Sequence, residues 1–288
     1  MTHPRPATAS GPRPRSTSSL WHQLRAAGIV WQRELIRFVR ARARIVGGLV
    51  QPLLFLFVLG SGLSPLIGQS GGINFTQFVF PGVIAMSVLS TALFSAVSIV
   101  WDREWGFLRE MLVAPVSRAA LVTGKALGGA TVATMQGAIM LTLAPVIGVR
   151  LSPQIVVSVI GASALMAFTL TGCGIFVASR IKRIESFQVV MQVLLFPMLF
   201  LSGALFPLHG LPAWLAALTR LNPVTYAVDP LRRAVLTGQD MTGEATARFG
   251  SGVTLLGQTV SVWAELGLVA VLGLTFLALS IRAFGKAE

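Results

Sequence analysis

The sequence predicts an all-α integral membrane protein with six transmembrane helices. Two observations carry this prediction. Of the 288 residues, 54% are hydrophobic and only 11% are charged, and long uncharged apolar runs recur along the chain. A soluble domain is about 25% charged, and one globular core of this size could not bury so much apolar surface. The net charge of +13 does not indicate nucleic-acid binding, because the basic residues mostly flank the apolar runs.

The N-terminal 1–19 segment is rich in Pro, Ser, Thr and Arg and has almost nothing to bury. This composition predicts a disordered tail. The segment that follows is amphipathic, whereas a cleaved signal peptide would continue into a short apolar core. We therefore expect no cleavage.

Residues 20–44 are expected to form an amphipathic helix. Its apolar residues recur at spacings of three or four, which places them on one helical face: Leu20, Leu24, Ala27, Trp31, Leu35 and Phe38. The arginines lie largely off that face. Such a helix lies in the membrane interface, with Trp31 shielded from water and with Arg33 and Arg37 reaching the headgroups. The alternative is an ordinary surface helix of a soluble domain.

Crossing a bilayer takes about 20 apolar residues. Six segments are long enough: 45–64, 79–101, 124–148, 154–179, 186–206 and 262–281. The first five contain one charge, Lys125, at the expected cytoplasmic edge of the third. The sixth contains only Glu265, near one end.

The distribution of basic residues predicts the orientation. Of the 23 Lys and Arg residues, eighteen fall on the side of the N-terminus. Five fall on the other side, namely Arg150, Arg220, Arg232, Arg233 and Arg248. The positive-inside rule therefore places both termini in the cytoplasm, as an even number of spans requires. We expect a multi-pass protein of the inner (cytoplasmic) cell membrane.

The segment 207–237 is neither a straight span nor a free loop. It contains four prolines and several charges, yet also Trp214, Tyr226 and many aliphatic residues. Pro212 and Pro223 are each placed to start a helix, since proline is tolerated in the first turn. Two short helices dipping into the outer leaflet would satisfy their backbone groups. The alternative is a loop packed on the rim of the bundle. Residues 238–261, rich in Gly and Thr, are expected to form an external loop.

The stretch "WDREWGFLREMLVAPVSR", residues 101–118, carries six charges. Inserting each charged residue at mid-membrane costs about 2.5–3.5 kcal/mol, so this stretch must be cytoplasmic. Asp102 and Glu104 are expected in the first turn of a helix and Pro115 after its end. Trp105, Leu108 and Leu112 would share one face of this helix. Aromatic residues and balanced acids predict a docking site here.

Two long motifs resemble those of the ABC type-2 permeases of the drug-resistance and lipooligosaccharide export group. "DREWGFLREMLVAPVSR" followed by "GKALGGA" resembles their cytoplasmic loop, and "FPLHGLPAWLAALTRLNPVTYAVDPLR" resembles their external re-entrant segment before the last span. The "FPG" at 80–82 also fits the family. The resemblance covers roughly residues 20–285, with the transmembrane domain at 45–285.

The resemblance implies a coupling helix at about 102–114 that enters a cleft on a cytoplasmic ABC ATPase. Its residues would be Asp102, Arg103, Glu104, Trp105, Gly106, Leu108, Arg109, Glu110 and Pro115. It also implies a transporter of two permeases, identical or related, and two ATPases. The chain has no G-x-x-x-x-G-K-[ST] motif, so we expect ATP and Mg on the partner and no cofactor or metal here.

The re-entrant pair is expected to act as an external gate. Its residues would be Gly203, Pro207, Pro212, Trp214, Asn222, Pro223 and Tyr226, with a flexible join at Gly203 and Pro207. Phe55, Met86, Phe94 and Phe196 are candidates for the substrate path, because aromatic and Met surfaces suit amphiphilic cargo. Ordinary helix packing is the alternative for these four. We expect export of hydrophobic drugs or lipid-like molecules, with lipid-linked glycan or lipooligosaccharide as the alternative cargo.

Three other functions remain open. A proton-coupled carrier usually has ionisable residues inside its spans, and the first five spans contain no carboxylate. A membrane enzyme would need a catalytic constellation, which His3, His22, His209 and the lone Cys173 do not supply. A membrane scaffold could also carry a docking helix. Membrane lipids are expected partners, and nucleic acid is not.

Overall fold

The computed structural model describes residues 20–67, 75–106, 117–206, 211–237, 252, 254–255 and 258–286. The predicted tail 1–19 lies outside these residues. The helices are α1 (Leu20–Arg40), α2 (Arg42–Ile67), α3 (Phe75–Ser95), α4 (Val97–Glu104), α6 (Arg118–Leu141), η1 (Ala144–Ile147), α7 (Pro153–Ala178), α8 (Ile184–Phe200), α9 (Ala213–Leu221), α10 (Thr225–Thr237) and α12 (Val262–Lys286). Two short antiparallel strands, β1 (Thr254–Leu255) and β2 (Gln258–Thr259), fall in the predicted external loop.

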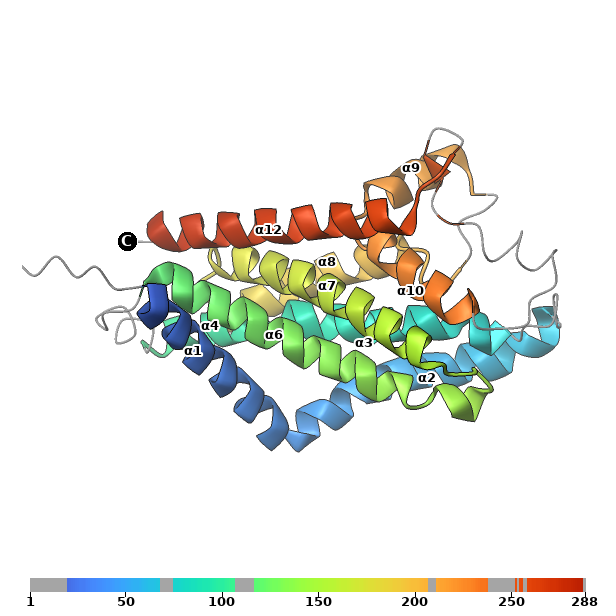
Figure 1. Ribbon diagram of the computed structural model, residues 1–288, viewed down its shortest axis with the longest axis horizontal. Helices are drawn as coiled ribbons and strands as arrows, with labels where there is room; N and C mark the ends of the chain where they lie inside the picture. Colours follow the sequence, from blue (N-terminus) through green and yellow to red (C-terminus); the bar gives the residue numbers. More distant parts are fainter. Residues whose placement is uncertain are drawn as a thin grey trace, which may run out of the picture.

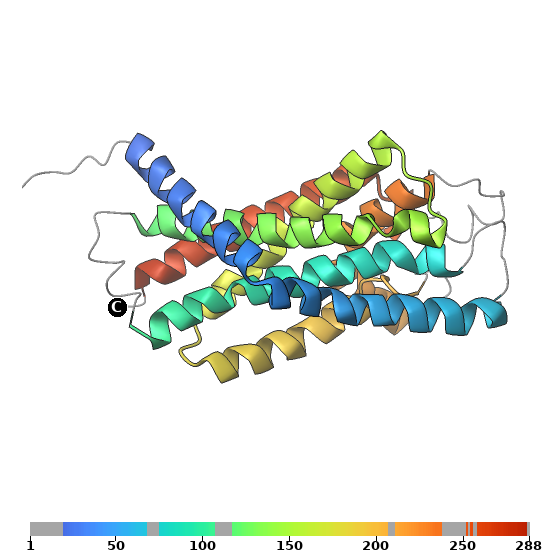
Figure 2. The ribbon, with the colours of Figure 1, turned by 90° about the horizontal axis from the view of Figure 1, so that it is seen from below.

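The long helices run side by side in one elongated bundle (Figures 1 and 2). Helix α3 forms its centre and packs against α2, α6, α7, α8 and α10. Its large side chains, including Phe78, Phe80, Ile84 and Leu89, are almost fully buried. A helix that is apolar all round belongs in such a position, because each of its faces meets another helix.

Within the described part of the chain, five helical segments are long and apolar enough to cross a membrane: Arg42–Gly62, Phe75–Glu104, Arg118–Ile147, Pro153–Ala178 and Val262–Phe284. A helical, multi-pass architecture is therefore confirmed. The fifth predicted segment, 186–206, forms α8, which has 17 residues. At 1.5 Å per residue such a helix is about 25 Å long, somewhat shorter than a hydrocarbon core of about 30 Å.

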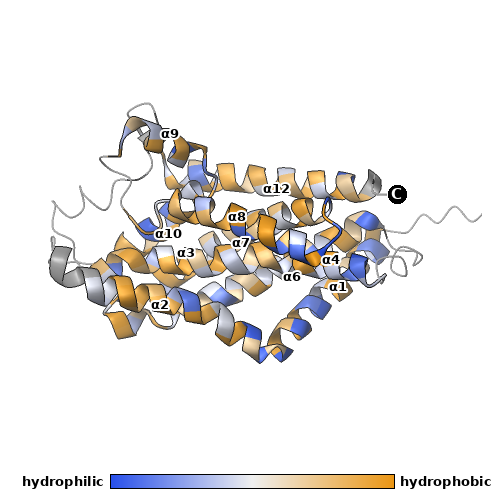
Figure 3. Ribbon diagram, turned by 180° about the vertical axis from the view of Figure 1, so that it is seen from behind, coloured by the Kyte–Doolittle hydropathy of each residue, from blue (hydrophilic) through white to orange (hydrophobic). Residues whose placement is uncertain are grey.

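The bundle has two distinct ends, which we name after short helices. The α4 end carries the last turn of α4, the start of α6 and the turn between α7 and α8; the α10 end carries α9, α10 and the start of α12 (Figure 1). Helix α1 crosses the bundle at an angle and meets α2 at a bend around Ala41, partway along the bundle. Hydrophilic residues gather on α1 and α4, whereas the long helices are mostly hydrophobic (Figure 3).

The proline-rich segment forms the two short helices that the sequence predicts. Pro212 is the N-cap of α9, and Pro223 lies in the turn before α10. The two helices differ in burial, which the sequence did not indicate. Helix α10 is buried against α3, α7 and α12, whereas α9 exposes Trp214 and Leu221. Of the pair, α10 is thus the part that is integrated into the bundle.

Candidate functional site

The secondary structure at the start of the charged stretch 101–118 differs from the predicted one. Helix α4 starts at Val97 and ends at Glu104, so Asp102 and Glu104 lie in its last turn and not in the first turn of a new helix. Gly106 follows with a φ of +80°, a conformation that glycine adopts without steric cost. The prediction of a single helix over 102–114 is therefore wrong about where that helix starts. Leu108, Arg109, Glu110 and Pro115 lie outside the described residues.

Asp102 lies at the centre of a buried ion cluster. Its Oδ2 is 2.6 Å from Nζ of Lys125 on α6 and 3.5 Å from Nη2 of Arg33 on α1. The side chains of Lys125 and Asp102 are only 3% and 10% exposed. Lys125 also donates to Ser98 Oγ at 3.2 Å and lies 3.7 Å from Oε1 of Glu34. We call Arg33, Glu34, Asp102 and Lys125 the α4 cluster.

The next two residues attach α4 to the other side of the bundle. Nη1 of Arg103 donates to the backbone carbonyls of Ala178, Ser179 and Ile181 at 3.3, 3.2 and 3.0 Å. Glu104 Oε2 accepts the backbone N–H of Ile184, the first residue of α8, at 3.1 Å. Trp105 and Gly106 then lie at the surface. The end of α4 is thus bonded to α1, α6, α7 and α8, and its charges point largely into the protein.

Helix α1 uses its apolar face to contact protein. Trp31 Nε1 donates to Thr131 Oγ1 of α6 at 3.1 Å, and Trp31 is 38% exposed. Gly124 of α6 permits the close approach, since a Cβ there would lie 2.6 Å from the carbonyl oxygen of Ala27. Of the predicted apolar stripe, Ala27 and Phe38 are buried, and α1 as a whole packs on α6. Leu20 and Leu24 remain exposed.

Most of the predicted gate residues meet at the α10 end. Asn222 links the two short helices to α8, since its Nδ2 donates to the Met198 carbonyl at 2.7 Å. Tyr226 donates from its hydroxyl to the Arg220 carbonyl at 2.8 Å. Gly203 has a φ of +72°, and its carbonyl accepts a hydrogen bond from buried Arg232. The expected flexible join is thus a bonded turn, and Pro207 lies outside the described residues.

A second ion cluster at the α10 end was missed. Arg233 Nη2 is 2.6 Å from Asp229 Oδ2 and 3.4 Å from Oε1 of Glu265, whose side chain is fully buried. We call Asp229, Arg233 and Glu265 the α10 cluster. Two signals in the sequence pointed to it. Asp229 and Arg233 are spaced i,i+4 on one helix, and Glu265 is the only charge in its apolar run, where a partner is expected.

The four candidate path residues differ in burial. Met86 is buried inside α3, Phe55 and Phe94 are half-buried, and Phe196 is exposed on α8. None of them lines either of two concave sites on the described surface. One is a groove on α1; the other is a pocket of about 570 Å³ between α7, α10 and α12. Among the described residues no group of His, Cys, Asp and Glu could hold a metal.

The arrangement of long apolar helices, with short amphipathic helices at their ends, defines a polytopic helical membrane protein. Residues 25–236 match the family of ABC-2 type transporters. The chain belongs to this family, as its two long motifs predicted.

Relatives agree with this assignment. Nodulation protein J of Rhizobium leguminosarum bv. trifolii is 30% identical over 212 residues, which cover 72% of this chain and 80% of that protein. A putative transport permease, ycf38, of Cyanophora paradoxa is 29% identical over 209 residues, covering 71% and 72%. Nodulation protein J of Sinorhizobium fredii is 27% identical over 251 residues, covering 85% and 90%.

Proposed function

We propose that the chain is the membrane permease subunit of an ATP-driven exporter and that a separate ABC ATPase drives it through the α4 end. The family and the relatives named as transport permeases support a transport role. The observation that carries the proposal is the attachment of α4. Asp102 bonds to α6 and α1, while Arg103 and Glu104 bond to the α7–α8 turn. A displacement applied beside Trp105 would therefore reach four helices at once.

The same proposal assigns partners and orientation. Two copies of the ATPase would bind ATP and Mg, and a second permease, identical or related, would complete the pathway. The α4 end and both termini would face the cytoplasm of the inner membrane. The excess of Lys and Arg on that side supports this orientation. The six spans would be α2, α3 with α4, α6, α7, α8 and α12.

The α10 end would form the external gate. The helical backbone is interrupted just before α10, where Asn222 and Pro223 lie in a turn. Helix α10 itself is buried among α3, α7 and α12. Irregular backbone at membrane depth persists where protein or an aqueous cavity surrounds it. Gate opening would then move α10 together with the turn at Gly203, because Arg232 joins them.

The pocket at the α10 end supports hydrophobic or amphiphilic cargo. Its walls are mostly apolar, with Ile155, Val157, Trp263 and Leu266, and a few polar groups enter it from Gln154, Ser158 and Arg233. A volume of about 570 Å³ and this composition are typical of sites for small amphiphiles. Drug-like or lipid-like molecules fit this description. Lipid-linked glycan or lipooligosaccharide is the alternative, in which only the lipid part would enter.

Transport in proteoliposomes tests the proposal. The permease is reconstituted with its cognate ABC ATPase, and ATP-dependent movement of a fluorescent amphiphilic dye is measured beside that of a lipid-linked glycan. We expect dye movement that needs ATP and does not need a proton gradient. Movement driven by a proton gradient alone would contradict the proposal, and glycan movement without dye movement would select the alternative cargo.

A cavity-filling variant tests the pocket separately. Gly161 lines the pocket, and an added Cβ there meets no atom within 4 Å. Gly161→Phe should therefore fill the pocket without disturbing the fold and should reduce dye transport several-fold. Gly267→Phe on α12 is the matched control, because it is equally unhindered and does not line the pocket. Equal transport by both variants would exclude the pocket from the path.

A further inference from the structure

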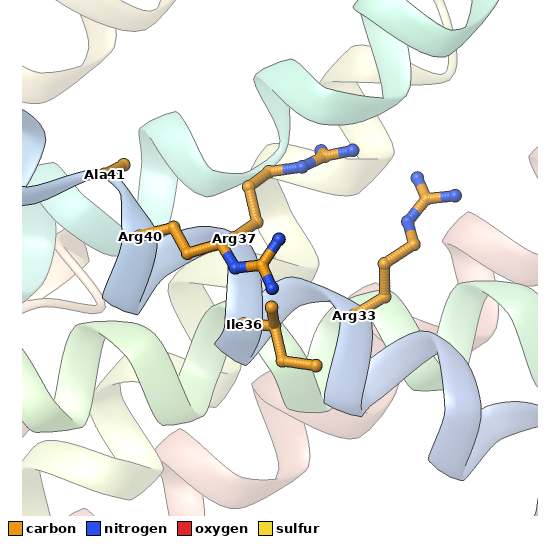
Figure 4. Close-up of a pocket in the computed structure, with 5 residues that line it drawn as sticks. All are labelled: Arg33, Ile36, Arg37, Arg40 and Ala41. Atoms are coloured by element: carbon orange, nitrogen blue, oxygen red, sulfur yellow. The ribbon is translucent and has the colours of Figure 1, made fainter.

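A shallow groove lies on α1 just before its bend into α2. It is lined by Arg33, Ile36, Arg37, Arg40 and Ala41 and has a volume of about 430 Å³. The three arginines are spaced four and three residues apart, so they share one helical face with Ile36. Figure 4 shows these side chains leaving successive turns of the same stretch of α1. We call this site the arginine groove.

The arginine groove carries excess positive charge. Its three arginines and the neighbouring Lys125 are four cations, whereas the carboxylates paired with them in the described part of the chain are those of Glu34 and Asp102. The arginine pairs are long, 3.5 Å for Arg33–Asp102 and 3.8 Å for Arg37–Glu34. The side chains of Arg33 and Arg37 are 43% and 40% exposed. Their guanidinium groups can therefore bind a further anion.

The position of the groove indicates the source of that anion. It ends at Ala41, and α2, a candidate membrane span, begins at Arg42. Large apolar side chains are exposed on the same part of α1, namely Ile29, Ile36 and Val39. A surface that presents arginines beside exposed aliphatic residues next to a membrane span matches the boundary between headgroups and acyl chains. A small soluble anion would contact the arginines alone and would leave these aliphatic residues exposed to water.

We propose that the arginine groove binds the phosphate of an anionic phospholipid in the leaflet where α2 begins. Arginine suits this role because its planar fork donates two parallel hydrogen bonds to phosphate oxygens. Ile36 and the first residues of α2 would contact the acyl chains. Arg33 also bonds Asp102, so an occupied groove connects the lipid to the α4 cluster. Asp102 keeps Lys125 at 2.6 Å when Arg33 turns to the lipid.

The connection to the α4 cluster rests on the proposed coupling function, whereas lipid binding itself requires no ATPase. Native mass spectrometry of the purified permease, titrated with phosphatidylglycerol in mild detergent, therefore tests the site alone. Arg37→Gln/Arg40→Gln should weaken phosphatidylglycerol binding about tenfold for each lost charged hydrogen bond. The matched control is Arg25→Gln/Arg183→Gln, which removes the same charge at exposed positions outside the groove. This control should bind like the unchanged protein.

Three results would overturn the proposal. The two double variants could bind phosphatidylglycerol equally well, phosphatidylcholine could bind as tightly as phosphatidylglycerol, or millimolar inorganic phosphate could displace the lipid. The last result would indicate a site for a soluble anion. Arg37→Lys/Arg40→Lys keeps the charge and removes the planar fork, so it decides the matter if the glutamine variant fails to fold. It should weaken binding several-fold, and unchanged binding would contradict recognition by arginine.

Discussion

Replacing Lys125 by Met should destabilise the permease strongly, although the change makes an apolar helix more apolar. Lys125 is buried in α6 and its ammonium is 2.6 Å from Asp102. Removing one partner of a buried ion pair leaves the other charge uncompensated, at a cost of about 3–5 kcal/mol. Arg33 remains near Asp102 at 3.5 Å, and a partly exposed pair of this kind offsets about 0–1 kcal/mol.

The expected loss is therefore about 2–5 kcal/mol, which is roughly a 30- to 5,000-fold change in the ratio of folded to unfolded protein. The assay is thermal and denaturant unfolding of the detergent-solubilised permease, followed by size-exclusion chromatography. Lys182→Met is the matched control, because Lys182 is exposed in the turn between α7 and α8. A surface substitution of this kind changes stability by no more than about 0.5 kcal/mol.

A double variant separates charge pairing from packing. Lys125→Met/Asp102→Asn leaves no buried carboxylate at position 102, so it should be more stable than Lys125→Met alone by about 1 kcal/mol or more. The argument would be refuted if Lys125→Met were as stable as Lys182→Met. It would also fail if the double variant were less stable than Lys125→Met, because then packing of the Lys125 side chain, and not its charge, would carry the effect.

Three further predictions concern the other contacts. Gly124→Val places a side chain against the Ala27 carbonyl and should release α1 from α6, seen as faster cysteine labelling along α1; unchanged labelling would contradict the close approach. Gly203→Val forces a β-branched residue to φ +72°, which costs about 1–2 kcal/mol; it should slow export and leave ATPase binding intact, and wild-type export would exclude a gating role. Glu104→Lys removes the acceptor for the Ile184 N–H and should lower permease-stimulated ATP hydrolysis several-fold at normal membrane levels; full stimulation would contradict the coupling role of the α4 end.

The helices themselves were predictable because their causes are local. Apolar runs of about 20 residues predict membrane helices whatever the rest of the chain does. Likewise, Pro212 and Pro223 predict helix starts from the fixed φ of proline alone. Five of the six predicted runs form helices long enough to cross a membrane, and Pro212 and Pro223 lie at or just before the start of a helix. Their tertiary environment was not predictable in the same way, which is why the burial of α10 and the exposure of α9 were unforeseen.

The start of the coupling stretch differs from its prediction because a weak local preference, that of acids for a first helical turn, is outweighed by a strong ion pair with a residue distant in the sequence. Acids in a first helical turn gain about 0.3–1 kcal/mol from the helix dipole. That preference made Asp102 and Glu104 look like the beginning of a helix. The buried pair of Asp102 with Lys125, 23 residues further along the chain, involves several times that energy. Spacing along the sequence does not reveal such a partner, although the isolation of Lys125 in an apolar run shows that one is required.

The two isolated charges in the apolar runs mark the places where short helices join the long ones. Lys125 is paired with charges from α4 and α1, and Glu265 is paired with Arg233 of α10. Separating either set would leave a charge unpaired inside the bundle, at a cost of about 2.5–3.5 kcal/mol on the membrane-insertion scale. We therefore expect α1, α4 and α6 to move as one unit and α10 and α12 as another. Conformational change during transport should then occur between these units, at contacts such as those of α6 with α12.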